Sequence, residues 1–97
     1  MDNVLVRQRN NVKVFGTGKQ VLMFAHGFGC DQTMWRFVTE NMQRDYRIVT
    51  FDYVGSGESD LSAFNSTRYA SLDGFATDIT DILEAMNLTG VTLIGHS

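Results

Sequence analysis

The sequence has no proline and a single cysteine, Cys30, in 97 residues. One cysteine cannot form an intramolecular disulfide, and this favours a reducing compartment such as the cytoplasm, where the protein is expected to reside. Cys30 itself is expected to be a small buried side chain. The lack of proline carries no functional implication.

Long hydrophobic runs and an excess of basic charge are also missing. No stretch approaches the roughly 20 apolar residues that a membrane-spanning helix requires, and the N-terminus lacks the basic and apolar regions of a signal peptide. A net charge of −3 leaves no basic stripe for nucleic acid. Neither nucleic acid nor a membrane is therefore expected as a partner, and a hydrophobic content of 43% is typical of a globular domain.

The glycine patterns of nucleotide-binding sites are absent as well. Two G-x-G pairs, Gly16-x-Gly18 and Gly55-x-Gly57, have Val21 and Asp60 at the position that a dinucleotide fingerprint reserves for a third glycine. There is no G-K-[S/T] phosphate loop, and no carboxylate–histidine cluster has the spacing of metal ligands. We therefore predict neither a cofactor nor a metal ion.

What the sequence does contain is a series of short apolar runs. Loose alternation over residues 4–8 and 10–15 predicts two short strands, a β-hairpin. Residues 21–25, 48–51 and 91–94 are apolar without alternation, which is typical of parallel strands covered on both faces. The run at 91–94 is expected to become an exposed edge if nothing follows it.

Two amphipathic segments separate these strands. The first has Asp31 as its expected N-cap and a core-facing stripe of Met34, Trp35, Val38 and Met42, so Trp35 should be buried beneath it. The second begins near Ser71. It places Phe75, Ile79, Ile82, Leu83 and Met86 toward the core and Thr77, Asp78, Asp81 and Glu84 toward solvent. The order strand, helix, strand, helix, strand predicts an α/β fold built from two βαβ units.

Residues with chemical potential follow the strands, where ligands bind in open parallel sheets. Gly95-His96-Ser97 follows the last strand and matches the first half of a nucleophile elbow, G-x-S-x-G, with Ser97 as nucleophile. Three residues alone also fit an ordinary strand-ending turn. The His26-Gly27-Phe28-Gly29 loop after an earlier strand strengthens the elbow interpretation, because the backbone N–H of Phe28 is then a candidate oxyanion-hole donor.

The other polar residues of these loops have simpler interpretations. Asp52 and Asp60 are expected to anchor the turns that follow them through backbone hydrogen bonds. His26 is expected to brace its own glycine turn, and His96 should point away from the hydroxyl of Ser97. Neither histidine is expected to be the general base.

Taken together, the loops resemble the RsbQ family of α/β-hydrolases, and plant strigolactone and karrikin receptors are similar to the same family. The resemblance covers nearly the whole chain. The residues that carry it are Asn11-Val12-Lys13-Val14, Gly16-Thr17-Gly18, residues 26–32, Trp35, residues 51–57, Ser59-Asp60-Leu61, Arg68-Tyr69, Leu72-Asp73-Gly74 and Gly95-His96-Ser97.

This resemblance implies a Ser-His-Asp triad with Ser97 as nucleophile and oxyanion donors from Phe28 and the residue after Ser97. In this fold the acid and base follow the nucleophile, so residues 1–97 are expected to be the N-terminal part of one domain. The resemblance further implies a positive regulator of a bacterial sigma-B stress pathway, a serine/threonine phosphatase as partner and a small hydrophobic ligand. A hydrolase, a ligand-sensing regulator and an inactive structural fragment remain as alternatives.

Overall fold

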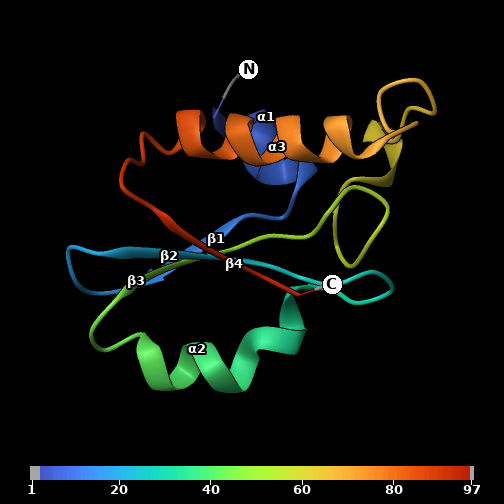
Figure 1. Ribbon diagram of the computed structural model, residues 1–97. Helices are drawn as coiled ribbons and strands as arrows, with labels where there is room; N and C mark the ends of the chain where they lie inside the picture. Colours follow the sequence, from blue (N-terminus) through green and yellow to red (C-terminus); the bar gives the residue numbers. More distant parts are fainter. Residues whose placement is uncertain (1–2, 97) are drawn as a thin grey trace.

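The computed structural model describes residues 3–96, which form a four-stranded sheet between two layers of helix (Figure 1). Strand order is β1-β3-β2-β4; β2 runs parallel to β3 and β4, and β1 runs antiparallel to β3. Helices α1 and α3 cover one face and α2 covers the other. The elements are α1 (Asn3–Arg9), β1 (Lys13–Gly16), β2 (Val21–Ala25), the 3₁₀ turn η1 (Gln32–Trp35), α2 (Arg36–Met42), β3 (Arg47–Thr50), the 3₁₀ turn η2 (Leu61–Ala63), α3 (Leu72–Ala85) and β4 (Thr92–Gly95).

Strand β2 supplies the centre of both cores, and all five of its residues are buried. Val21, Met23 and Ala25 point to the face covered by α1 and α3. There they pack with Val6 and Ile82. Leu22 and Phe24 pack on the opposite face. The prediction of a parallel strand covered on both sides is confirmed, and so is the α/β class.

The predicted strand at residues 4–8 is wrong, because this segment is helix α1. Val6 is fully buried, but Val4 is 62% exposed, so the two valines do not share a strand face. Helix α1 instead packs against α3, and this tertiary contact outweighs the weak alternation of a short segment. Strand β1 accordingly pairs with β3 and forms no hairpin with residues 4–8.

Helices α1 and α3 end in the same way, at an asparagine in the left-handed region. Asn11 has φ +46° and Asn87 has φ +54°. After α1 the N–H of Val12 donates to the carbonyl of Arg7, and after α3 the N–H of Leu88 donates to the carbonyl of Leu83. These bonds span five residues, as in the Schellman motif, where asparagine is the usual substitute for glycine.

The segment after β2 begins as predicted and then departs from its predicted stripe. Asp31 caps η1 by accepting hydrogen bonds from the hydroxyl and backbone N–H of Thr33, and these bonds lower the pKa of its carboxyl. Val38, expected in the core, is 43% exposed, and Thr39 is buried in its place. The reason is that the segment begins with the 3₁₀ turn η1. A 3₁₀ helix has 3.0 residues per turn instead of the 3.6 of an α-helix, so the buried side of α2 is rotated from the predicted stripe.

Trp35 is half-buried rather than fully buried, and its ring packs 5.0 Å from that of Phe24. Trp35→Ala should lower the free energy of unfolding by about 2–4 kcal/mol, near the lower end for a core aromatic. Phe37→Ala is the matched control: Phe37 is 65% exposed, and its loss should cost no more than about 0.5 kcal/mol. Urea unfolding of a protein containing this segment measures both, and equal losses would contradict the packing of Trp35.

Helix α3 begins where the sequence predicts, with the side chain of Ser71 accepting from the N–H of Asp73. Ile82 is buried, and most of the predicted stripe packs around it. Asp78, expected to face solvent, is completely buried. Its carboxylate is held by two arginines from other segments, which periodicity along α3 could not reveal.

Strand β4 lies at the edge of the sheet in the part of the chain that the structure describes. It pairs with β2 only, and Leu93 is 52% exposed. Among residues 3–96, no helix is long and apolar enough to cross a lipid bilayer.

Candidate active site

The carboxyl ends of β2, β3 and β4 meet at one edge of the sheet because these three strands are parallel. The loop after β2 carries His26 and Phe28, the loop after β3 carries Asp52 and Tyr53, and His96 follows β4. The loops singled out by the sequence therefore lie side by side at the edge where this architecture binds ligands.

His26 ties the first two loops together. It is 3% exposed, and its Nε2 accepts a hydrogen bond from the backbone N–H of Tyr53 at 3.0 Å. Its Nδ1 lies 2.9 Å from the carbonyl oxygen of Gly27, so Nδ1 carries the proton and donates there. The predicted bracing of the glycine turn is confirmed. The bond to Tyr53 is an additional tether that the sequence did not indicate.

Removing this tether should misplace the Phe28 loop. In the complete protein, His26→Ala is expected to lower kcat about 100-fold with little change in KM, as a displacement near 1 Å can do. His26→Asn separates the two bonds, since its amide can still donate to the Gly27 carbonyl but cannot reach Tyr53. Steady-state ester hydrolysis measures both variants, and an unchanged kcat in His26→Ala would show that the loop holds its position without His26.

Phe28 lies at the tip of a tight turn. Cys30 donates its N–H to the carbonyl of Gly27 at 3.1 Å, and Gly29 has φ +77°. The Phe28 side chain is fully exposed, and within residues 3–96 its N–H donates no hydrogen bond. A backbone N–H in this condition is what an oxyanion-hole donor requires. Cys30, expected to be buried, is only half-buried in the turn.

Asp52 anchors the loop after β3, as predicted, and does more. Its carboxylate is 1% exposed and accepts from the N–H of Glu58, the N–H of Gln32 and the side-chain amide of Asn11. It thus joins three segments beside the site. Gly57 is required here, because a Cβ would lie 2.6 Å from the Asp52 carboxylate.

Asp60 behaves as predicted in the same loop. Its carboxylate accepts from the N–H and the hydroxyl of Ser62 and caps η2.

The end of β4 contacts the loop after β2 directly. The N–H of His96 donates to the carbonyl of Ala25 at 3.2 Å. A Cβ added to Gly27 would lie 2.4 Å from Nδ1 of His96, so position 27 admits only glycine while His96 stays in place. This contact brings the residue that precedes Ser97 against the turn that carries Phe28. Ser97 itself lies outside the described residues, so its role stays a prediction.

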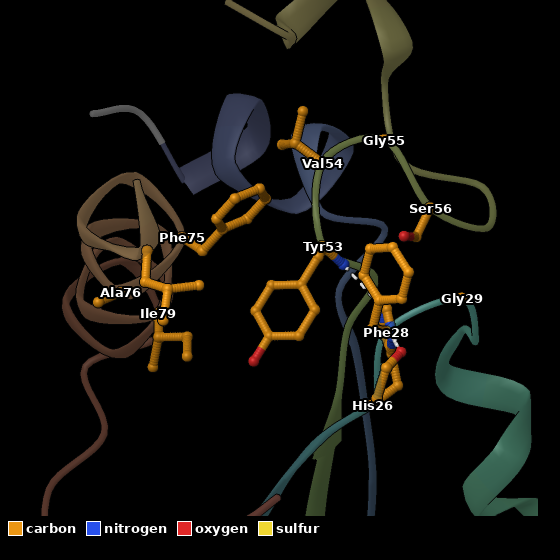
Figure 2. A pocket seen from close by; sticks show the side chains of 12 residues that line it. His26, Phe28, Gly29, Tyr53, Val54, Gly55, Ser56, Phe75, Ala76 and Ile79 are labelled. Carbon is orange, nitrogen blue, oxygen red and sulfur yellow. Dashed lines mark hydrogen bonds between the residues drawn. The ribbon is translucent and has the colours of Figure 1, made fainter. Parts of the chain in front are cut away.

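An apolar cleft of about 650 Å³ opens between these loops and the first half of α3. Figure 2 shows the ring of Tyr53 between Phe75 and Ile79 on one side and His26 and Phe28 on the other. Burial raises the pKa of the Tyr53 hydroxyl, which keeps it protonated near neutral pH. The walls that this part of the chain supplies therefore suit an uncharged, hydrophobic molecule.

Within residues 3–96, no three histidine, cysteine or carboxylate side chains are placed to hold a metal ion.

Comparison with known proteins agrees with this geometry. The family model described as the alpha/beta hydrolase fold matches residues 20–97. The chain belongs to the α/β-hydrolase family. A solved structure of a hydrolase from Oleispira antarctica is 46% identical, with a TM-score of 0.95, over 99% of this chain and 35% of that one.

Curated plant relatives are also similar. The karrikin insensitive 2 receptor CA of Petunia hybrida is 38% identical over 96% of this chain and 34% of its own length. A strigolactone esterase of Arabidopsis thaliana is 36% identical over 90% of this chain and 33% of its own length. The chain thus spans about a third of the length of these relatives.

Proposed function

We propose that the complete protein is a serine hydrolase acting on a small hydrophobic ester-like or carbonyl compound. The observation that carries this proposal is the contact between Gly27 and His96, because it sets the Phe28 turn beside the residue before Ser97. Hydrolase relatives and the apolar cleft support the same conclusion.

In this mechanism the Oγ of Ser97 gives its proton to a histidine base and attacks the carbonyl carbon of the ester; the ester C–O bond then breaks, the alcohol leaves with that proton, and water releases the acid from Ser97. The carbonyl oxygen gains negative charge, and the N–H groups of Phe28 and of the residue after Ser97 donate to it. A histidine base and its carboxylate partner, which follow the nucleophile in this fold, complete the Ser-His-Asp triad. His26 is unsuited to be that base, since both of its ring nitrogens bind backbone groups.

A second candidate is a ligand-sensing regulator that does not turn over its ligand rapidly. Relatives named as karrikin insensitive receptors favour it, and the similar proteins also include one named as a strigolactone esterase. In its RsbQ-like form, this regulator binds a small hydrophobic molecule, recruits a serine/threonine phosphatase and promotes a bacterial sigma-B stress response. Deleting the gene should then blunt that stress response, and a normal response would count against this role.

Turnover number separates the two functions. We expect the complete protein to hydrolyse p-nitrophenyl acetate with many cycles per active site, after a burst if deacylation is slow. A single cycle per active site would favour the regulator. No release of p-nitrophenol from this ester or from longer-chain esters would contradict the hydrolase.

A further inference from the structure

A cluster of charged groups around the buried Asp78 lies apart from the residues that line the cleft. It joins α1, the segment before α3 and α3 itself. Asp78 is its centre: the carboxylate accepts from the hydroxyl of Tyr69 at 2.7 Å and is paired with Arg68 and, at 3.3 Å, with Arg9. Asp81 pairs with Arg9 at 3.1 Å and with Arg68 at 3.4 Å.

The charges of this cluster balance, with two arginines against two carboxylates. Burying an ion pair costs desolvation energy comparable to what the attraction returns, so such pairs add little stability over apolar packing. They do fix one arrangement of the segments that carry them. Burial and the hydrogen bond to Asp78 raise the pKa of the Tyr69 hydroxyl, which therefore remains a donor. The cluster is best explained by the geometry it imposes.

That geometry reaches the cleft through aromatic contacts. The ring of Tyr69 lies 4.8 Å from the ring of Phe75, and the ring of Phe75 lies 5.8 Å from that of Tyr53. Figure 2 shows Phe75 beside Tyr53. The segment of Arg68 also crosses the first turn of α3 so closely that a Cβ on Gly74 would lie 2.0 Å from the Arg68 carbonyl oxygen. Phe75 and Tyr53 line the cleft, and Tyr69 connects the charged cluster to Phe75.

We propose that Tyr69 and Asp78 are positioning residues that select the substrate by chain length. By holding Phe75 against Tyr53, they keep in place the apolar wall along which a longer chain lies. Figure 2 shows Phe75 on the far side of Tyr53 from His26 and Phe28, so a short chain held at the Phe28 turn is expected to stay clear of Phe75. This inference rests on the proposed hydrolase function and adds a specificity determinant that does not touch the substrate.

The test uses the complete protein and two fluorophosphonates, one with an ethyl and one with a dodecyl chain. Tyr69→Phe removes a hydroxyl only, and Asp78→Asn removes the charge. In both variants the second-order rate constant for labelling by the dodecyl probe should fall about fivefold, because the probe binds less tightly before it reacts. The rate constant for the ethyl probe should change less than about twofold. Tyr46→Phe is the matched control, because Tyr46 packs on the opposite face of the sheet, and it should change neither rate.

Each outcome is decisive. A selective loss for the dodecyl probe supports the proposal, and Tyr69→Phe alone suffices if Asp78→Asn does not fold. Equal losses for both probes, or no loss for either, would overturn it while leaving the hydrolase function intact. If neither probe labels the unmodified protein, the hydrolase function fails and this inference fails with it.

Discussion

Replacing Ser97 with alanine is expected to lower ester hydrolysis by the complete protein about 10⁵–10⁶-fold, because no other group can form the acyl-enzyme. The small rate that remains would come from the oxyanion hole and substrate binding. Binding of a small hydrophobic ligand should persist, since the alanine leaves the cleft walls in place. Hydrolysis at saturating substrate measures the first effect, and calorimetric titration with a non-hydrolysable analogue measures the second.

Ser66→Ala is the matched control, since Ser66 is exposed and does not line the cleft. It should hydrolyse the ester at nearly the rate of the unmodified protein. A Ser97→Ala variant that retains more than about a tenth of the activity would contradict the assignment of the nucleophile.

Loss of the Asp52 carboxylate should have the largest effect on stability. Asp52→Ala leaves three donors beside the site without their acceptor, from Asn11, Gln32 and Glu58. A buried donor without its acceptor costs about 1–3 kcal/mol; only the bond from Gln32 is fully buried and the other two are partly buried, so the free energy of unfolding should fall by about 3–5 kcal/mol. Urea unfolding followed by circular dichroism measures this loss.

Asp60→Ala provides the comparison, because Asp60 is exposed and caps only one short turn. Its loss should cost about 1 kcal/mol. If the two variants lose the same stability, the loops around the site do not depend on Asp52 as the structure indicates.

The sequence was sufficient for features with strong local signals. The continuous apolar run of β2 indicated burial on both faces, and the glycines that follow it indicated a tight turn carrying Phe28. Asp52, two residues after the end of β3, was correctly interpreted as an anchor. The positions of these residues depend on their immediate neighbours in the sequence and on strand direction. The local sequence pattern was therefore enough to predict them.

Features that depend on distant partners were missed. Helix α1 is held by Val6 against the core and by Arg9 on Asp78, and short alternation gave the wrong element. Asp78 looked like a solvent-facing helical residue, because the arginines that pair with it come from elsewhere in the chain. The asparagine Asn11 was an available helix-ending signal that the alternation obscured.

The central claim is that Ser97 is an activated nucleophile beside the Phe28 turn. Labelling the complete protein with a fluorophosphonate, followed by proteolysis and peptide mass spectrometry, tests it most directly. We expect one adduct per protein, located on Ser97, formed about 100-fold more slowly in His26→Ala and absent in Ser97→Ala. An adduct on another residue, or an intact mass that does not change, would contradict it.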